Sequence, residues 1–542
     1  MSWLLRWRLP VGNDVLLEHF AQMVSRAEDV PKLNEAILQL AVQGKLVSQD
    51  PNDEPASELI KRIEAEKQQL IEEKKIKKSK PLPEITDEER PFTLPEGWEW
   101  ARLGNLVSQM GSGSTPRGGK KIYQEKGIKF LRSQNVWNEG LRIDGVACIP
   151  PEIHEKMKRT TVYPKDILLN ITGASIGRSA LVSDDFDTGN VSQHVCIIRL
   201  IGLETRQFIH KCIISPYFQK TIMDVQVGIS REGLSKASLS EILVPLPPLA
   251  EQKRILKHVD ILLAQTRQLE KELADAEKSL SSLHRAATRD LLSASDAVEF
   301  EQKWQFIANN FDTLYDEAYP EAALANVAEL KQTILQLAVQ GKLTRQDKMP
   351  NCVKLGEIVS LRGGGTPSKR NPEYWGGEIP WISPKDMKKL DLYDSKDRIT
   401  EFAVQSKAAK LIPINSVLVV VRGMILLHTV PAGVLRVNAA INQDIKALIP
   451  SSSLTSEYLR LIIWGHNPNL LNLIERSTHG TCKLKTPDLL NFEVLLPALA
   501  EQKRIVTRVN TLLHLCDALS THIQEAQATR TALRDAVLAG VG

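Results

Sequence analysis

The heptapeptide Leu249-Ala-Glu-Gln-Lys-Arg-Ile255 occurs twice in the chain, and its second copy occupies residues 499–505. The copies begin 250 residues apart in a chain of 542. Each follows a proline-containing apolar run and opens a pattern of apolar residues spaced alternately four and three apart, over about five heptads. This spacing predicts two equivalent long helices, each roughly 40 residues or about 60 Å in length.

Because the two helices carry matching apolar stripes, the simplest arrangement packs one stripe on the other as a coiled-coil seam. Arg530 stands where the first copy has Leu280, so that layer is expected near an end or in water. The seam residues expected to hold the spacer together are Ile255, Val259, Leu262, Leu269, Leu273, Leu280, Ile505, Val509, Leu512, Leu519, Ile523 and Leu533.

The bulk composition is that of an ordinary globular protein of three or four domains. A net charge of only +4 means that any basic surface must be local. The six cysteines form no C-x-x-C pair, so neither a zinc site nor a disulfide framework is indicated. We see no apolar run long enough for a signal peptide or a membrane span, and the cytoplasm is the expected compartment.

A second repeat lies beside the first. The run Ile37-Leu-Gln-Leu-Ala-Val-Gln-Gly-Lys-Leu46 recurs 297 residues later, at 334–343. Gly44 and Gly341 are placed as helix C-terminal glycines. The larger offset means that the first half carries an insertion near 47–95. We interpret it as an exposed charged helix that frays into a proline-rich linker. Its basic run is typical of a solvated face, with a phosphate-contacting arm as the alternative.

Two globular segments, 96–248 and 351–497, can be laid over each other at offsets near 250. Gly113-Ser-Thr-Pro116 matches Gly364-Gly-Thr-Pro367, and Ser192-Gln-His-Val195 matches Asn442-Gln-Asp-Ile445. Buried strand-like runs interleave with helical stretches, so each segment is predicted to be a mixed α/β domain. The loops between matched strands differ, which suggests two related ligands read by one architecture.

The predicted organisation has six parts, and it is close to a circular permutation of a two-fold repeat, so the two chain termini are expected to lie near each other. The parts are an N-terminal helical region (1–46), the charged helix and linker (47–95), the first globular domain (96–248), a central helical region (249–350) with its long helix at 251–291, the second globular domain (351–497) and a C-terminal long helix (498–542).

The sequence shows no recognisable catalyst. The glycine-rich loop at 111–121 lacks phosphate-loop spacing, because Ser114 stands where the first glycine is needed and Lys121 where the hydroxyl is needed. Asn371-Pro-Glu-Tyr374 is interpreted as a turn. No G-x-S-x-G, H-E-x-x-H or paired metal-ligand spacing is found, so no metal and no catalytic residue is assigned. An enzyme with an unrecognised site would show turnover by the purified chain alone.

Binding residues are easier to find, because basic and amide side chains gather in the loops. Arginine can bridge guanine O6 and N7, asparagine or glutamine can bridge adenine N6 and N7, and lysine holds phosphates. Gln193 and Gln443 lie in strand-like runs and are expected to be satisfied core amides. The candidate DNA contacts are Arg117, Lys120, Lys121, Arg132, Ser133, Gln134, Asn135, Asn138, Arg178, Arg231, Lys369, Arg370, Ser383, Lys385, Asp386, Arg422, Lys483 and Lys485.

The two doubled motifs, together with Leu94-Pro-Glu-Gly-Trp-Glu-Trp100 and the Gly-Thr-Pro loops, resemble the specificity subunit of type I restriction–modification systems. The resemblance covers nearly the whole chain. It implies two target-recognition domains, each reading one half of a bipartite double-stranded DNA site. It also implies that the long helices form an antiparallel coiled coil that sets the gap between the half-sites.

The same resemblance implies partners. Two methyltransferase subunits would carry S-adenosylmethionine, and restriction subunits that use ATP and Mg would join them, while this chain would bind no cofactor and contribute no catalytic residue. The insertion at 47–95 departs from a symmetric pattern, and its role is left open. A different class of function is also open, a non-catalytic protein–protein scaffold whose duplicated domains grip other proteins. Binding to random-sequence duplex DNA at rising salt would distinguish the two.

Overall fold

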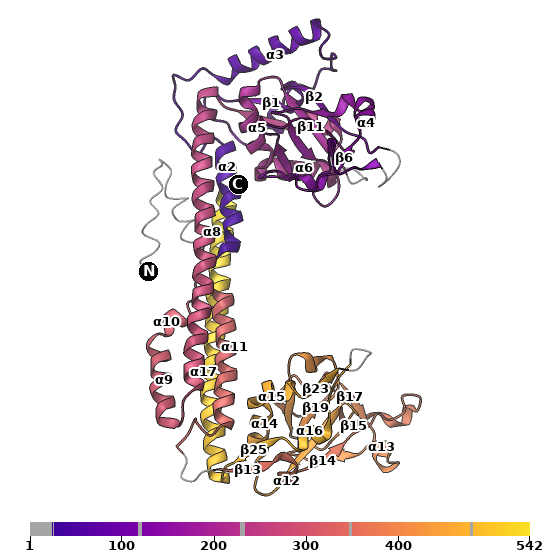
Figure 1. The fold of residues 1–542 in the computed structure, drawn as a ribbon, viewed down its shortest axis with the longest axis vertical. Helices are drawn as coiled ribbons and strands as arrows, with labels where there is room; N and C mark the ends of the chain where they lie inside the picture. The colour runs from indigo at the N-terminus through magenta and orange to yellow at the C-terminus, as the bar shows by residue number, and fades with distance from the viewer. Residues whose placement is uncertain are drawn as a thin grey trace. The chain divides into compact units, whose positions relative to one another are not determined.

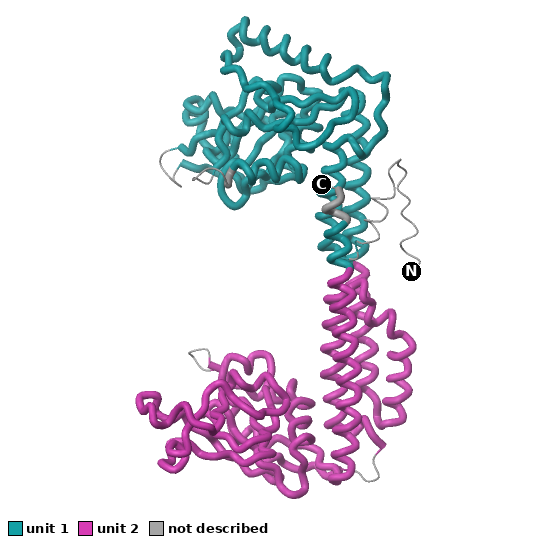
Figure 2. Tube along the Cα trace, turned by 180° about the vertical axis from the view of Figure 1, so that it is seen from behind, with its two compact units in different colours: residues 1–274, 530–542 teal, residues 275–529 magenta. Residues whose placement is uncertain are grey.

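The computed structural model describes residues 24, 26–116, 122–227, 233–345, 350–476 and 481–541, and these form two compact units (Figure 2). Unit 1 comprises residues 1–274 and 530–542, and unit 2 comprises residues 275–529. Two long helices belong to both units, because α8 (Leu249–Leu292) and α17 (Leu499–Val541) each cross the boundary. The prediction of two long helices, each opening on the repeated heptapeptide, is confirmed.

Each unit contains a third bundle helix, which the heptad pattern alone did not anticipate. In unit 1, α2 (Val30–Val42) shares a hydrophobic core with the first seam residues of α8, Ile255, Val259 and Leu262. In unit 2, α11 (Pro320–Val339) shares a core with the matching residues of α17. Within unit 2 the end of α8 and most of α17 run side by side in opposite directions (Figures 1 and 2). The repeated short helix therefore covers the start of each long helix.

The seam follows the expected register for most of its length and then changes face. Leu280 and Ile523 are buried, and Leu269, Leu273 and Leu519 are partly buried. Leu533 was expected in the seam, and that expectation is wrong, because its side chain is 56% exposed. The buried residue of that turn is its neighbour Arg534, which forms an ion pair with Asp29.

The two ends of the described chain meet in unit 1, as the repeat arithmetic predicted. Asp29, just before α2, accepts a hydrogen bond from Arg534 near the end of α17 at 2.5 Å, and both side chains are buried. Lys32 lies 3.5 Å from Asp535 on the same pair of helices. Residues 14–23 of the predicted N-terminal helix lie outside the described residues. Gly44 and Gly341 end α2 and α11 with φ of 68° and 72°, as expected of helix C-terminal glycines.

Domain 1 of unit 1 begins and ends in one antiparallel ribbon, because β1 (Glu99–Arg102) pairs with β12 (Leu243–Leu246). Between them lie two four-stranded sheets and the hairpin of β4 (Val136–Trp137) and β5 (Gly140–Leu141). One sheet has the order β6 (Cys148–Ile149), β3 (Ile128–Leu131), β10 (Gly189–Val191) and β7 (Thr161–Val162). The other has the order β2 (Val107–Ser112), β11 (Val195–Leu200), β8 (Ile167–Asn170) and β9 (Ser179–Leu181).

Domain 2 of unit 2 repeats this plan. Its closing ribbon pairs β13 (Asn351–Lys354) with β25 (Glu493–Leu496), and a separate hairpin joins β23 (Ile474–Arg476) to β24 (Cys482–Leu484). One sheet has the order β17 (Asp397–Ile399), β15 (Trp375–Ile382), β21 (Ala439–Ile441) and β18 (Leu411–Ile412). The other has the order β14 (Val359–Gly363), β22 (Ile445–Pro450), β19 (Val417–Val420), β20 (Ala432–Leu435) and β16 (Asp391–Leu392).

Shorter helices flank these sheets. In both domains the central strand is fully buried, and for β19 its continuous apolar, valine-rich sequence predicted this. The domain 1 helices are α4 (Pro151–Lys156), α5 (Arg206–Ile213), α6 (Pro216–Val227) and α7 (Lys236–Glu241). Those of domain 2 are α12 (Leu355–Ile358), α13 (Glu401–Gln405), α14 (Ser456–Gly465), α15 (Asn467–Leu471) and α16 (Thr486–Leu490). Between α8 and α11 the chain forms α9 (Ala297–Asn309) and α10 (Phe311–Leu314).

The insertion is more firmly attached than an exposed, fraying helix. Its helix α3 (Ala56–Glu72) buries Leu59 and Ile63 in the core of domain 1. The linker that follows lies over the buried Arg102, which donates hydrogen bonds to Pro83 O at 2.7 Å and Glu84 O at 3.0 Å. The expectation of a solvated charged helix therefore holds for only one face, and the insertion is part of the domain 1 fold.

Candidate nucleic-acid interface

In both domains a glycine brings the Gly-Thr-Pro or Gly-Ser-Thr-Pro loop against the end of a central strand. The Gly113 amide donates to Ser192 O at 3.2 Å, and a Cβ on Gly113 would lie 1.7 Å from Val191 O. A Cβ on Gly364 would lie 1.9 Å from Ile441 O. Only glycine can approach a backbone this closely. The repeated glycine thus fixes the loop beside β10 in one domain and β21 in the other.

A glutamine occupies the turn beside this loop in each domain. Gln193 lies between β10 and β11, and Gln443 between β21 and β22, and both side chains are exposed. The expectation that they are satisfied core amides is therefore wrong. Gln443 Oε1 accepts a hydrogen bond from Thr366 of the Gly-Thr-Pro loop at 2.6 Å. The exposed amides thus stand at corresponding positions on the two domains, 250 residues apart.

The segment after β3 supplies several of the predicted contacts of domain 1, but not all of them point outward. Asn135 is 4% exposed; its Oδ1 accepts from the Arg132 amide and its Nδ2 donates to Arg142 O. This side chain holds the loop, so it is withdrawn as a base contact. Asn138 is exposed, with its Oδ1 bound to the Ser179 amide at 3.0 Å.

The other described contacts predicted for domain 1 lie in this same segment or on the turn between β8 and β9. Gln134 is exposed, and the Ser133 carbonyl accepts from Asn170 Nδ2 at the end of β8 at 2.9 Å. The Arg132 guanidinium lies over the Tyr123 ring, 5.8 Å from its centroid. Arg178, on the turn between β8 and β9, lies over the ring of Trp137. Four further predicted contacts lie outside the described residues, namely Arg117, Lys120, Lys121 and Arg231.

In domain 2, some side chains of the segment after β15 hold its backbone in place, and others are exposed. Asp386 accepts from the Ser383 amide and hydroxyl, each at 2.9 Å, and from the Lys396 amide at 3.0 Å. Asp386 and the buried Ser383 therefore form a closed turn and are withdrawn as base contacts. Lys385, in the middle of that turn, is exposed.

The other predicted cations of domain 2 lie on loops and on the β23–β24 hairpin. An isolated bridge joins the backbone of Arg422, after β19, to that of Lys483 on β24, so the structure brings these two residues together. Lys485 forms a hydrogen-bonded ion pair with Glu475, and the hydrogen bond from the ammonium group to this carboxylate raises the pKa of Lys485. The predicted contacts with exposed side chains are Lys369, Arg370, Lys385, Arg422, Lys483 and Lys485.

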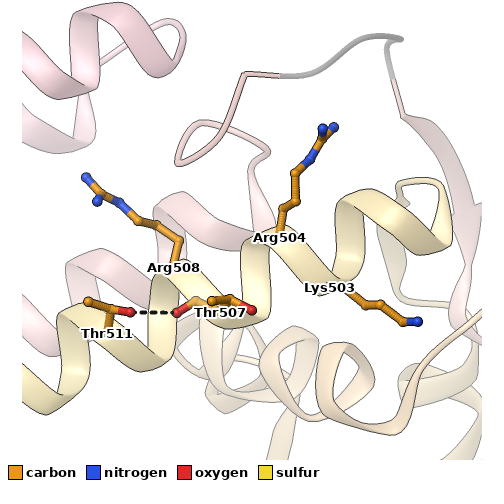
Figure 3. Close-up of a pocket in the computed structure, with 5 residues that line it drawn as sticks. All are labelled: Lys503, Arg504, Thr507, Arg508 and Thr511. Atoms are coloured by element: carbon orange, nitrogen blue, oxygen red, sulfur yellow. Dashed lines mark hydrogen bonds between the residues drawn. The ribbon is translucent and has the colours of Figure 1, made fainter.

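A basic groove lies at the start of α17, away from the loops that the sequence indicated. It is lined by Lys503, Arg504, Thr507, Arg508 and Thr511, and Arg504 and Arg508 project from the same side of the helix (Figure 3). Arg508 lies 3.1 Å from Glu301 of α9. The signal was available, because the Lys-Arg pair belongs to the repeated heptapeptide and recurs as Lys253 and Arg254.

Over the described ranges we find no group of three or more histidine, cysteine or acidic side chains placed to hold a metal ion. None of the described helices is long and apolar enough to span a membrane. The surface chemistry that the two domains share is therefore that of basic and amide side chains around paired strand ends.

The fold and these paired edges define a class of protein in which one chain carries two related binding domains on a helical frame. Residues 95–277 and 351–527 match the family described as the type I restriction modification DNA specificity domain. The chain belongs to this family, as its motifs suggested.

Curated relatives are similar in sequence to part of the chain. It is 34% identical over 338 residues to the EcoAI specificity subunit of Escherichia coli, covering 61% of this chain and 54% of the relative. It is 38% identical over 181 residues to the EcoR124I/EcoR124II specificity subunit, also of Escherichia coli, covering 33% of this chain and 44% of the relative. The chain spans about half the length of these curated relatives. Among solved structures, the HsdS subunit from Thermoanaerobacter tengcongensis is 20% identical with a TM-score of 0.45, covering 84% of this chain and 98% of that one.

Proposed function

We propose that the chain is the sequence-specific DNA-binding subunit of a type I restriction–modification complex and reads a bipartite duplex target, one half-site per domain. The observation that carries the proposal is the pair of matching edges in domains 1 and 2. The glycine loop and the exposed glutamine are the same in both, and the neighbouring outward side chains differ. A shared scaffold with different outward side chains suits two different half-sites.

The side chains divide by role in this proposal. Gln193 and Gln443 are base contacts, because a glutamine amide can bridge adenine N6 and N7 in the major groove. Lys369, Lys385 and Lys483 are exposed cations suited to phosphates. The exposed Lys253 and Lys503 at the start of α8 and α17 add further phosphate contacts, while their neighbours Arg254 and Arg504 form ion pairs with Asp53 and Glu501. Binding should therefore weaken steeply as the salt concentration rises.

The helical parts would recruit the other subunits. In unit 2, α9 exposes Val298 and Phe306, at 58% and 53%, and Leu515 of α17 is 57% exposed. Large exposed apolar side chains of this kind are suited to a protein partner. We propose that a methyltransferase subunit binds here, and that S-adenosylmethionine, ATP and Mg are bound by the partners. The chain then contributes recognition and no catalysis, in the cytoplasm beside the DNA.

The long helices would set the spacer. Since α8 runs from unit 1 into unit 2 as one helix of 44 residues, its length is suited to fixing the number of base pairs between the half-sites. Inserting one heptad in α8 and one in α17 should change the tolerated spacer and leave both half-sites unaltered. A selection from duplexes with randomised spacers tests this, and an unchanged spacer would refute the role of helix length.

The central test is a selection of the full chain, with and without methyltransferase subunits, on fully randomised duplex DNA. We expect enrichment of two short defined elements separated by undefined base pairs. Binding of all duplexes with equal affinity, or no binding at low salt, would contradict the proposal and favour a scaffold that grips proteins.

A further inference from the structure

Domain 1 holds two arginines on opposite faces of one tryptophan. The Trp137 ring, on the β4–β5 hairpin, has the Arg142 guanidinium 3.5 Å from its centroid and the Arg178 guanidinium 4.0 Å from it. The indole Nε1 donates a hydrogen bond to Gln134 O at 2.9 Å, which fixes the ring. Arg142 follows β5 directly, whereas Arg178 comes from the turn between β8 and β9. Two segments of the domain therefore meet at this tryptophan.

The two guanidinium groups lack a charged partner within the part of the chain that the structure describes. Neither side chain forms an ion pair or a hydrogen bond there. Other arginines of the same domain do have carboxylate partners, since Arg199 lies 2.7 Å from Asp166 and Arg206 lies 3.1 Å from Asp184. The ring attracts each guanidinium, but the two like charges repel each other, and an electron-rich ligand that binds both would relieve this repulsion. The arrangement thus points to a ligand.

The backbone around the stack is held in place. Asn135 Nδ2 donates to Arg142 O at 2.9 Å, and the Ser179 amide, next to Arg178, donates to Asn138 Oδ1 at 3.0 Å. Stacking leaves the N–H edge of each guanidinium free while restricting its plane. A donor fork that is already ordered loses little entropy when it binds, which favours tight and geometrically selective recognition.

We propose that Arg142 and Arg178 read guanine bases in the half-site of domain 1, with Trp137 as a positioning residue. The inference rests on the proposed DNA-binding function. Guanine presents two acceptors, O6 and N7, in the major groove, and a planar arginine fork matches them with two hydrogen bonds. A phosphate can accept from the same planar fork. The two ligands are distinguished by selection, because a base contact sets the preference at one position and a phosphate contact weakens binding to all sequences.

The stack belongs to one domain only. The residues of domain 2 that match Trp137 and Arg142 are Lys388 and Tyr393, because β3 and the end of β15, like Asn135 and Asp386, are related by an offset of 251. Lys388 is exposed and Tyr393 is 64% exposed, so domain 2 has a lysine and a tyrosine on its surface where domain 1 has the tryptophan and one arginine of the stack. The guanine contacts are therefore expected in one half-site and not in the other.

The test compares Arg142→Lys and Arg178→Lys, which keep the charge and remove the planar fork. Full chains are selected on randomised duplex DNA, and their preference at each position is compared with wild type. Arg206→Lys is the matched control, because Arg206 lies in the same domain and is paired with Asp184. Each test variant should reduce the preference for one guanine about 5- to 150-fold, with the second half-site unchanged. The control should leave both half-sites unchanged.

Trp137 is tested with two variants. Trp137→Phe keeps an aromatic face and should retain most of the guanine preference, whereas Trp137→Ala should lose it at an unchanged melting temperature. The inference is overturned if the wild-type site has no guanine in the half that responds, or if the lysine variants weaken all duplexes equally, as a phosphate contact would. If the wild-type chain enriches no site at all, the proposed function itself fails.

Discussion

Domains 1 and 2 share the residues that hold the backbone and differ in the residues that face outward. Gly113 and Gly364 each pass beside a strand end where a Cβ would collide with a carbonyl oxygen. Close by, both domains have a turn closed by a side chain, Asn135 or Asp386, which leads in domain 1 to the hairpin that carries Trp137 and in domain 2 to the exposed Lys388. The two domains therefore share the glycines that packing requires, whereas their exposed side chains differ. This difference is what the proposed reading of two half-sites by one fold requires.

The helical parts of the two units also differ, in the polar side chains that they bury at matching positions. In unit 1 a buried ion pair joins Asp29 to Arg534, whereas unit 2 has Asn326 and His284 at the matching places. Asn326 Nδ2 donates to Leu314 O at 3.0 Å, and His284 Nε2 lies 3.2 Å from the Tyr315 hydroxyl. One unit thus uses charges at this layer, and the other uses neutral hydrogen bonds.

The largest effect that we expect comes from breaking the charged layer. Asp29→Ala leaves the Arg534 charge buried without its main partner, and should cost about 3–5 kcal/mol of local stability. Asn326→Ala removes one neutral hydrogen bond in unit 2 and should cost about 1–3 kcal/mol. Native-state hydrogen exchange over α2 and over α11 measures the two losses separately. Equal losses in both units would show that the charges add nothing to this layer.

A pH effect should distinguish the two domains next. Burial lowers the pKa of His210 in α5 to about 4, and its Nε2 donates to Ser179 O. Since the folded state disfavours the protonated ring, its stabilising contribution is complete above pH about 6.5 and declines as the pH falls towards 4, by about 3 kcal/mol in all. The matching residue of domain 2 is Arg460, which stays charged throughout.

The measurement is the melting temperature at pH 7 and at pH 5, for wild type and for His210→Gln, which keeps a donor for Ser179 O. Wild type should lose more stability on acidification than the variant. A wild type and a variant with the same pH dependence would contradict the assignment of this titration to His210.

The repeated glutamines should give matched, smaller effects. Gln193→Ala and Gln443→Ala should each reduce the preference at one base pair, by about 1–3 kcal/mol, in different half-sites. Gln268→Ala is the control, because Gln268 is an exposed glutamine that donates to Glu272 on α8. Selection on randomised duplexes provides the measurement. If both variants altered the same half-site, the two domains would not act as separate readers.

The smallest effect is electrostatic. Lys253→Ala and Lys503→Ala remove matching exposed cations at the start of α8 and α17. Each should weaken binding to all sequences alike and lower the slope of log affinity against log salt by about 1. A titration between low and physiological salt measures this slope. A change in base preference instead would mean that these lysines contact bases.

The sequence repeats predicted much of this architecture. The heptad pattern failed near the end of α17, where the buried face of the helix has rotated away from the predicted stripe. The two offsets located both long helices, both domains and the helix-ending glycines. A strict heptad pattern then placed Leu533 in the seam, whereas the structure buries Arg534. A straight helix has 3.6 residues per turn, so its buried face drifts by about 20° per heptad from a 3.5 repeat. After five heptads the drift amounts to one residue.

The candidate interface was less predictable, because side-chain roles there depend on contacts between distant segments. Gln193 and Gln443 are flanked by apolar strands with no glycine or proline to mark the turn. Asparagine is a residue type that can contact bases, but the side-chain amide of Asn135 donates a hydrogen bond to Arg142 O. Arg142 itself was not selected from the sequence, since its importance comes from Trp137. Local pattern shows where loops are and does not show which side chains are already occupied.

The most direct test of the account exchanges residues 96–248 for the corresponding domain of another specificity subunit with a known target. The full chimeric chain is then selected on randomised duplex DNA. We predict that one half-site changes to that of the donor, while the other half-site and the spacer stay as in wild type. A change in both half-sites, or in neither, would contradict the claim that each domain reads its own half.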